Sequence, residues 1–225
     1  MAVRAAWVGL LCLIALGSAD LGASAGPAET CFGEAATITG TPGNDRIVLE
    51  LGDRNAVVVT QGGDDRIIVG AKHVRVCEGG GQGYVRIEDG FGVTRLNLGA
   101  GRDRVIYRGP VDIGTPEETI VRAGSGADRV FTGGFEDRLF GNEGNDLLSS
   151  WRDEDRLSGG AGDDELHAGP ESDRMRGGPG RDLLDGDLRD TSDYPAGEND
   201  RANGGGEFDR CEAEIVRECE EVGEF

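Results

Sequence analysis

Acidic and apolar residues recur with a fixed period through the C-terminal part of the chain. From Ala123 to Glu212 the sequence divides into consecutive nonapeptides with no insertion between them. An aspartate recurs every nine residues, at Asp128, Asp137, Asp146, Asp155, Asp164, Asp173 and Asp182. Two positions after each lies an apolar residue: Val130, Leu139, Leu148, Leu157, Leu166, Met175 and Leu184. Because a repeat this short cannot bury an apolar face by itself, the period predicts stacked coils with a shared core.

The N-terminal part repeats this pattern less strictly. The segments GTPGNDRIV, QGGDDRIIV and LGAGRDRVI each contain an aspartate followed two positions later by Ile or Val. Short β-prone runs, mostly bounded by Gly, Asp or Asn, indicate strands between turns, at 56–60, 73–76, 84–87, 93–96 and 119–121. We therefore predict an all-β fold, a right-handed parallel β-roll or β-solenoid, irregular in residues 26–122 and regular in residues 123–212. Residues 213–225 should cap the C-terminal end as a short helix or a last strand.

The composition limits the possible partners. The chain contains 40 Gly, 5% aromatic residues and a formal net charge of −20. Glycine suits the reversals between short strands because a positive φ angle costs it little. The negative charge argues against nucleic acid or an anionic membrane as a partner, and it predicts self-repulsion in a compact state unless cations bind.

The first 25 residues have the pattern of an export signal. Arg4 supplies the positive charge, residues 5–17 form a short apolar run, and Ala23-Ser24-Ala25 is an A-x-A cleavage site. A cut after Ala19 is the alternative. The apolar run is too short to span a bilayer comfortably, so we predict a secreted, extracellular protein without membrane insertion.

Four cysteines remain once Cys12 leaves with the signal. An even number of cysteines in an exported chain indicates disulfides. Four cysteines allow three pairings, and we expect Cys31–Cys77 and Cys211–Cys219 because each pair lies close in the sequence. Free buried thiols are the alternative.

Two nonapeptides carry a family resemblance. GGAGDDELH, from Gly159 to His167, and GGPGRDLLD, from Gly177 to Asp185, are similar to the RTX, or haemolysin-type, calcium-binding repeat G-G-x-G-x-D-x-U-x. The resemblance implies a Ca²⁺-binding β-roll in which two nonapeptides make one turn. It also implies that each six-residue loop shares Ca²⁺ with the loop one turn away, through aspartate carboxylates and loop carbonyls. Such oxygen-rich sites suit this hard cation.

In a β-roll of this kind, alternate nonapeptides would lie on opposite sides. The series of Asp128 mostly has glycine at the fourth loop position, whereas the series of Asp137 never does. We therefore predict an ordered Ca²⁺ column on the first side only, with about three or four sites. The residues expected at these sites are Gly126, Asp128, Gly141, Gly144, Asp146, Gly159, Gly160, Gly162, Asp164, Gly177, Gly178, Gly180, Asp182 and Asp200. The alternative, a metal-free solenoid, would leave columns of like charge unpaired.

Arginine follows the aspartate throughout most of the second series. The residues concerned are Arg138, Arg156, Arg174 and Arg210. We expect an Asp–Arg ladder that neutralises this column without metal, since the guanidinium pairs with carboxylates in a fixed fork. Solvated surface arginines are the alternative.

Catalytic motifs are missing from the sequence. No H-E-x-x-H or G-x-S-x-G motif occurs, and His73 and His167 lie far apart, with His167 expected to be solvated. The sequence therefore predicts a non-enzymatic, secreted calcium-binding protein with a structural or binding role. Two other interpretations stay open. One is an adhesin module that binds a cell-surface or extracellular polysaccharide through Tyr84, Tyr107, Trp151 or Tyr194. The other is a β-helix polysaccharide lyase or epimerase.

Overall fold

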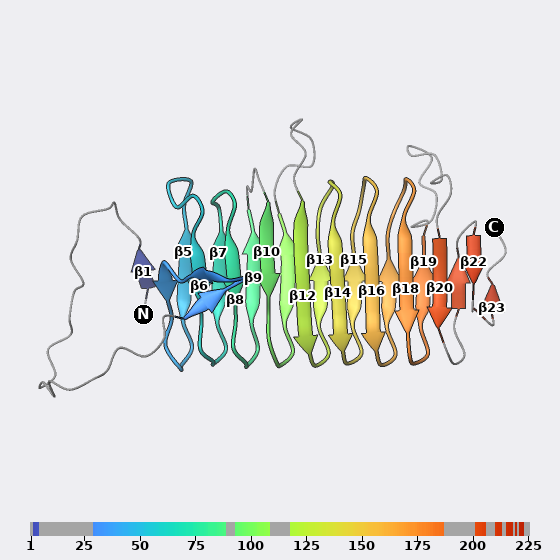
Figure 1. Ribbon diagram of the computed structural model, residues 1–225, viewed down its shortest axis with the longest axis horizontal. Coiled ribbons are helices and arrows are strands. Elements are labelled where there is room, and N and C mark those ends of the chain that lie inside the picture. The colour runs from blue at the N-terminus through green and yellow to red at the C-terminus, as the bar shows by residue number, and fades with distance from the viewer. Residues whose placement is uncertain are drawn as a thin grey trace, which may run out of the picture.

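The computed structural model describes residues 2–4, 29–88, 93–108, 118–186, 201–205, 210–212, 215–217, 219 and 221–222. In these residues the secondary structure is β throughout, and they include no helix that could cross a membrane. The strands form two long parallel sheets and one short antiparallel hairpin (Figure 1).

The two long sheets take strands alternately from the chain. The 11-stranded sheet contains β1 (Ala2–Arg4), β5 (Arg46–Leu49), β7 (Arg66–Val69), β9 (Tyr84–Ile87), β11 (Arg104–Tyr107), β13 (Arg129–Phe131), β15 (Leu147–Ser149), β17 (Glu165–His167), β19 (Leu183–Asp185), β21 (Arg210–Glu212) and β23 (Glu221–Val222). The 10-stranded sheet contains β4 (Ile38–Thr39), β6 (Val57–Val59), β8 (Arg75–Cys77), β10 (Thr94–Asn97), β12 (Thr119–Ser125), β14 (Arg138–Glu143), β16 (Arg156–Ala161), β18 (Arg174–Gly178), β20 (Arg201–Gly205) and β22 (Ile215–Arg217). The predicted all-β fold of stacked parallel coils is therefore confirmed.

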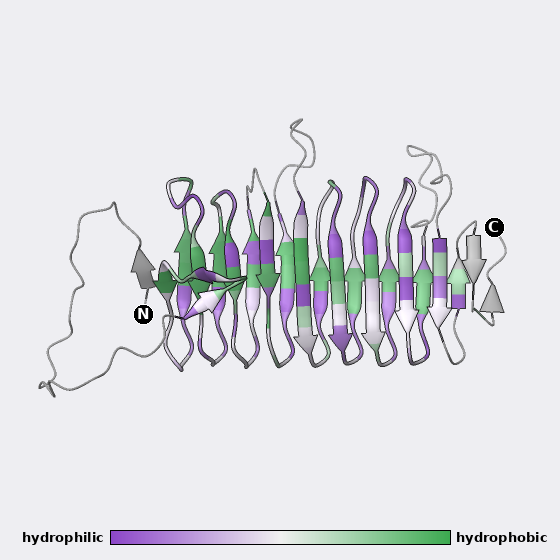
Figure 2. Ribbon diagram, viewed as in Figure 1, coloured by the Kyte–Doolittle hydropathy of each residue, from purple (hydrophilic) through white to green (hydrophobic). Residues whose placement is uncertain are grey.

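The apolar residue of each repeat lies between the sheets. In the 11-stranded sheet Val130, Leu148, Leu166 and Leu184 are aligned in register, and each is fully buried. The other sheet contributes a matching column that includes Val121, Leu139, Leu157 and Met175. Apolar segments accordingly lie within the strands, and hydrophilic segments lie toward the loops (Figure 2). Each buried Leu contributes about 1.5–3 kcal/mol relative to an exposed one, so the stacked columns supply the core that no single coil has.

The two edges of the solenoid differ in regularity. We call the glycine edge the set of six-residue loops that lead from the 10-stranded to the 11-stranded sheet, along the lower side of Figure 1. These loops are 40–45, 60–65, 78–83, 98–103, 123–128, 141–146, 159–164 and 177–182. We call the variable edge the loops that return to the 10-stranded sheet, among them 132–137, 150–155 and 168–173. In the described coils all differences in coil length fall on the variable edge, so the glycine edge continues unchanged through the irregular half.

One expectation about the repeat register is wrong. Arg201 pairs with Arg174, and Arg210 pairs with Leu183, so three nonapeptides rather than two separate these partners. The extra nonapeptide falls within the connection from β19 to β20, on the variable edge. Arg201, and with it the repeat of Asp200, therefore aligns with the series of Asp173, and Arg210 aligns with the series of Asp182. Asp200 itself lies outside the described residues.

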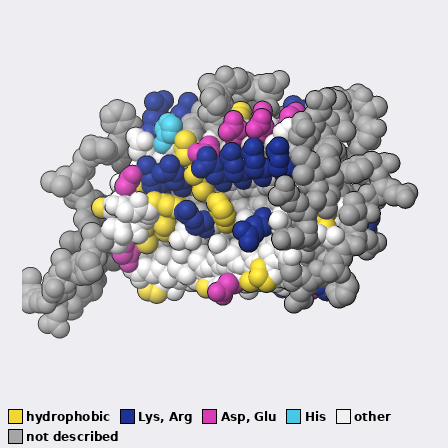
Figure 3. Space-filling model, turned by 45° about the vertical axis from the view of Figure 1, so that its right-hand side comes forward, with side chains coloured by type: hydrophobic (Ala, Val, Ile, Leu, Met, Phe, Trp, Pro, Cys, Tyr) yellow, Lys and Arg dark blue, Asp and Glu magenta, His cyan; other side chains and the backbone are white. Residues whose placement is uncertain are grey.

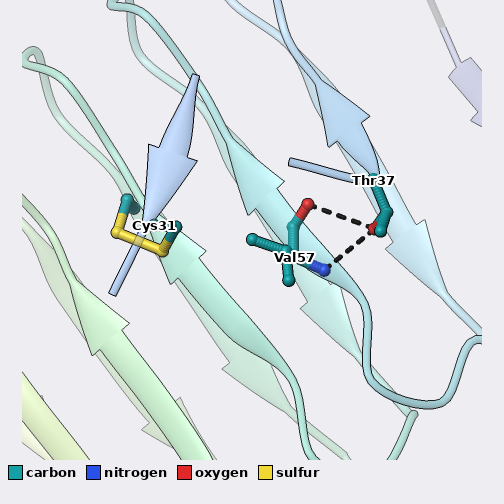
Figure 4. The surroundings of a disulfide bond; sticks show 4 residues. Cys31, Thr37 and Val57 are labelled. Carbon is teal, nitrogen blue, oxygen red and sulfur yellow. Dashed lines mark hydrogen bonds between the residues drawn. A yellow bond between two sulfur atoms is a disulfide. The ribbon is translucent and has the colours of Figure 1, made fainter. Parts of the chain in front are cut away.

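Both ends of the solenoid are held by disulfides. Cys31 bonds to Cys77 and Cys211 bonds to Cys219, which confirms the predicted pairing. Cys31 belongs to the antiparallel hairpin of β2 (Thr30–Cys31) and β3 (Glu34–Ala35), which lies against the first coils. Next to it the Thr37 hydroxyl accepts a hydrogen bond from Val57 N–H (2.9 Å) and donates one to the Val57 carbonyl (3.2 Å; Figure 4). At the other end β22 and β23 continue the two sheets as strands, not as a helix.

Candidate metal-binding edge

The backbone of the glycine edge requires glycine at the fourth loop position. In the described loops this position is always glycine, and its φ lies between +100° and +142° at Gly63, Gly81, Gly101, Gly126, Gly144, Gly162 and Gly180. A Cβ on any of the last four would lie 2.5–2.6 Å from the carbonyl carbon of the equivalent glycine one turn before, and nearer still to its oxygen. The carbonyl oxygens of successive turns therefore point along the solenoid axis in a column that only glycine allows.

A column of buried carboxylates runs beside these carbonyls. Asp103, Asp128, Asp146 and Asp164 are each at most 3% exposed. One oxygen, Oδ1, accepts the backbone N–H of the equivalent residue one turn before, as from Asp128 to Asp146 and from Asp146 to Asp164, at 2.9 Å in each case. The other oxygen, Oδ2, has no hydrogen-bond partner in these four aspartates. Each carboxylate thus has one oxygen bound to the backbone and one buried oxygen that lacks a donor.

Burial raises the pKa values of this column. The pKa of Asp146 rises to about 6, and the pKa values of Asp103 and Asp164 rise to about 7. In each case burial is the main cause, the backbone N–H bond opposes the rise, and neighbouring column carboxylates add to it. The charged form is therefore unfavourable in this column unless a cation lies next to it.

Ca²⁺ fits this donor set. In the described residues no three or more His, Cys, Asp or Glu side chains lie close enough together to hold a metal ion on their own. An ion at this edge would therefore take much of its coordination from backbone carbonyls, together with the free Oδ2 atoms. Ca²⁺ accepts carbonyl and carboxylate oxygens in flexible numbers, whereas Zn²⁺ prefers nitrogen and sulfur ligands in a fixed tetrahedron.

The residues predicted to bind calcium lie together on this edge, Asp200 excepted. Gly141, Gly159 and Gly177 occupy the first loop position, where a Cβ would overlap the aspartate carboxylate of the same loop. Gly160 and Gly178 occupy the second position with φ near +120°. The predicted residues cover only the regular half and do not include the loops that end at Asp45, Asp65 and Asp103. The signal for these loops in the sequence is the glycine two residues before each of these aspartates, as in the regular half.

The variable edge has the same aspartates in a different setting. The fourth loop position is occupied by Phe135, Asp153 and Glu171, and each still has a positive φ, of 117°, 72° and 83°. The loop reversal is thus kept without glycine, at a cost in backbone strain. The hydroxyls of Thr132 and Ser150 lower the pKa values of Asp137 and Asp155, but burial has the larger effect and raises them to about 7 and about 9.

The predicted Asp–Arg ladder does not form at the variable edge. Arg138, Arg156 and Arg174 are exposed, whereas Asp137 and Asp155 are buried. In the described residues no ion pair joins these arginines to the two carboxylates, and Arg138 instead pairs with Glu118 at 2.9 Å. Since successive residues of a strand point to opposite faces, an arginine directly after a buried aspartate faces outward. The side chains align in register along the outer face of the 10-stranded sheet, and Figure 3 shows a row of basic side chains on the surface.

The two histidines do not meet in a common site. His73 lies in the turn before β8, and His167 lies at the end of β17 in a different coil. His167 is half-buried and hydrogen-bonds Glu165 at 2.8 Å. Asp185 and Glu165 together raise the pKa of His167 against the opposing effect of burial. The expected solvated histidine is therefore an ion-pairing residue on the sheet surface.

The architecture defines a parallel β-solenoid, and its glycine edge presents a column of carbonyl and carboxylate oxygens that could hold cations. A family model described as the RTX calcium-binding nonapeptide repeat (4 copies) matches residues 34–53, 122–157 and 152–184. The chain thus carries RTX calcium-binding repeats, as the resemblance predicted, and one matched segment lies in the irregular half. No curated protein and no solved structure matches the chain.

Proposed function

We propose that this protein is a secreted, non-catalytic calcium-binding solenoid whose coils are held together by Ca²⁺ along the glycine edge. One observation carries the proposal: buried Oδ2 atoms without a donor lie beside a column of glycine carbonyls. A buried carboxylate without a partner is strongly unfavourable. Calcium between successive loops would neutralise this charge and link each coil to the next.

Calcium would then act as part of the fold. A ligand that binds only the folded chain stabilises it by RT ln(1 + [L]/Kd), which is about 1.4 kcal/mol per site when the ligand is ten times Kd. Extracellular calcium modules commonly have Kd values on the order of 10⁻⁴–10⁻³ M. Millimolar calcium outside the cell would therefore favour the compact state, and the low calcium inside would not.

Calorimetric titration of the exported chain with Ca²⁺ tests this proposal directly. We expect several ions per chain, because the loops of the glycine edge share one geometry. Zero bound ions would leave a metal-free solenoid and would contradict the proposal. The same titration of Asp146→Asn should give fewer ions than the parent chain.

Secretion and the absence of catalysis rest on separate observations. The A-x-A export signal and two disulfides are typical of an exported protein. The two histidines lie in different coils, and the sequence contains only one lysine, Lys72, and no H-E-x-x-H or G-x-S-x-G motif. Mass spectrometry of the chain recovered from culture medium should find a new N-terminus at Gly26, and an intact N-terminus would contradict cleavage at this site.

A row of exposed arginines supports a second candidate function, the binding of an acidic polysaccharide. Arg138, Arg156, Arg174 and Arg201 are exposed and adjacent in register. Neighbouring strands lie about 4.8 Å apart, and like charges at such positions are unfavourable. A linear polyanion would relieve this repulsion. The aromatic candidates favour it less. The exposed Trp151 has the Arg152 guanidinium over its ring at 5.3 Å, and Tyr84 has that of Arg66 at 5.0 Å. Tyr107 packs against the core, and Tyr194 lies outside the described residues.

Retention on polygalacturonate compared with neutral dextran tests this second function. We expect retention that falls with salt and that is weakened at least about fivefold, or about 1 kcal/mol, in Arg156→Gln/Arg174→Gln. The matched control is Arg104→Gln/Arg129→Gln, which removes two exposed arginines from the opposite sheet. Equal retention of both double variants would contradict a role for the row. Parallel runs with chelator distinguish binding of the polysaccharide by the arginines from binding through bridging Ca²⁺ ions.

A further inference from the structure

One loop of the glycine edge lacks the aspartate that the others share. In the described loops the sixth position is Asp45, Asp65, Asp103, Asp128, Asp146, Asp164 and Asp182, but in loop 78–83 it is Gly83. The backbone of Gly83 nevertheless follows the column. Its N–H donates to Asp103 Oδ1 at 2.7 Å, and its carbonyl accepts the N–H of Arg104 at 2.9 Å. The loop is therefore in register, and only the side chain is missing.

The missing side chain is replaced from the other end of the same loop. Glu78 occupies the first loop position, and its carboxylate extends to the place where an aspartate at position 83 would lie. A Cβ built on Gly83 would be 2.8 Å from Glu78 Cδ and nearer still to Oε2, and 3.1 Å from Asp103 Oδ1. Glu78 is 8% exposed, and its Oε1 has no hydrogen-bond partner.

The first and sixth loop positions share one space in the loops that begin with Gly141 and Gly159. At Gly141 and Gly159, a Cβ in the first position would lie 2.9 Å and 2.7 Å from the aspartate Cγ of the same loop. Where the sixth residue is aspartate, the first is therefore small in these loops. Loop 78–83 has the reverse arrangement, with a large acidic residue first and glycine sixth.

The buried carboxyl group of Glu78 needs an explanation that packing does not give. Other loops place Thr60, Leu98 and Ala123 at the first position, so neutral and apolar side chains are accommodated there. A buried carboxylate with an oxygen that lacks a donor is unfavourable unless a cation or donor lies next to it. The neighbouring turns also continue the carbonyl column, because a Cβ on Gly81 would overlap the carbonyl of Gly63, and one on Gly101 would overlap that of Gly81.

We propose that Glu78 replaces the absent aspartate as a Ca²⁺ ligand, so that the metal column runs unbroken between the coils of Asp65 and Asp103. This inference rests on the proposed calcium binding of the glycine edge. It extends that binding into the irregular half, at a loop that does not contain the aspartate of the repeat. The ligand class is a divalent cation with oxygen preference, held by the Glu78 carboxylate, the free Oδ2 of Asp103 and glycine carbonyls of this loop and its neighbours.

Calcium stoichiometry in three variants of the full exported chain tests the inference. Glu78→Gln keeps the size of the side chain and removes its charge, and it should lower the stoichiometry by about one ion per chain. The exchange variant Glu78→Gly/Gly83→Asp restores the common arrangement, and it should bind as many ions as the parent. Gly83 has no positive φ, so its backbone accepts an aspartate. Asp146→Asn serves as a control in the regular half.

The outcomes separate this inference from the proposed function. If Asp146→Asn loses calcium and Glu78→Gln does not, the edge binds calcium but Glu78 is not a ligand, and the inference is overturned. If the parent chain binds none, both fail together. Should Glu78→Gln not fold, the exchange variant decides: parental stoichiometry supports the inference, and fewer ions overturn it. Circular dichroism at saturating calcium confirms that each titrated variant is folded.

Discussion

The two edges of the solenoid carry similar buried aspartates with an Oδ2 that lacks a donor, as in Asp146 and Asp155, yet they differ in loop length and in the residue at the fourth loop position. The glycine edge keeps a six-residue loop with glycine at its fourth position in each described coil. The variable edge accepts longer connections, and at that position it has Phe135, Asp153 and Glu171. The aspartate ladder on both edges aligns the coils through N–H bonds to Oδ1. The aspartate ladder is thus common to both edges, whereas the column of glycine carbonyls makes one edge suitable for a cation.

Calcium removal tests the glycine edge as a whole and should have the largest effect. Four sites at ten times Kd would contribute about 5–6 kcal/mol, a large share of the usual 5–15 kcal/mol stability of a domain. We expect chelator to lower the thermal midpoint by at least about 10 °C and to reduce the β signal in circular dichroism. Superimposable melting curves with and without chelator would contradict this expectation.

Substitutions at the fourth loop position should separate the edges. Gly144→Ala places a Cβ 2.5 Å from the carbonyl carbon of Gly126 at a φ of +126°. We expect it to cost about 3 kcal/mol or more. The matched change on the variable edge, Asp153→Gly, relieves a positive φ of 72° and should alter stability by less than about 1 kcal/mol. Urea denaturation in saturating calcium measures the free energy of unfolding of both variants. Equal destabilisation by the two substitutions would contradict a requirement for glycine that is specific to the glycine edge.

Neutralising one aspartate on each edge should affect calcium differently. Asp146→Asn removes a charge next to the glycine carbonyls, so we expect the calcium-dependent part of the stability to fall by about 1–3 kcal/mol. Asp155 has a pKa of about 9 and is uncharged at pH 7. Its asparagine still accepts the N–H of Asp137, so Asp155→Asn should change neither stoichiometry nor stability by much. Loss of calcium in Asp155→Asn would assign ions to the variable edge as well.

Protonation of the buried aspartates should stabilise the calcium-free protein at acid pH. The folded pKa values of Asp146 and Asp164, about 6 and about 7, lie above the unfolded value of about 3.9. A raised folded pKa contributes stability that is fully present below about pH 4 and is lost as the pH rises through 6 to 7. In chelator the thermal midpoint should therefore be higher at pH 5 than at pH 8. A midpoint that falls on acidification through this range would contradict the buried, protonated column.

The exposed arginines should contribute least to stability. Arg156 and Arg174 are exposed, whereas the aspartates that precede them on the variable edge are buried. Arg156→Gln/Arg174→Gln should therefore change the stability of the chelated protein by less than about 0.5 kcal/mol. A loss of about 2 kcal/mol in low salt would restore the idea that these arginines neutralise the aspartate column.

Much of the fold follows from the sequence because one period specifies both the strand and its stacking. Aspartate and the apolar residue two positions later predicted the parallel coils, the core columns and the edge that carries glycine. The register after Asp182 could not be predicted, because an extra nonapeptide fits a long connection as well as a coil. Loop 78–83 was missed because the repeat was recognised by its aspartate. Only the space shared by the first and sixth loop positions shows that Glu78 supplies the carboxylate.

The aspartate ladder also gives the solenoid a polarity. On both edges backbone N–H groups donate to the aspartate of the following turn, as from Asp128 to Asp146 and from Asp137 to Asp155. Truncation from the N-terminal end removes donors of this ladder, and each remaining ladder N–H keeps its carboxylate, although strand N–H groups such as that of Leu147 lose the carbonyl of the preceding turn. Truncation from the C-terminal end removes the carboxylate acceptors and leaves a buried ladder N–H without one, which costs free energy. During export or synthesis from the N-terminus, the ladder N–H of each turn therefore finds its carboxylate acceptor only when the next turn has folded.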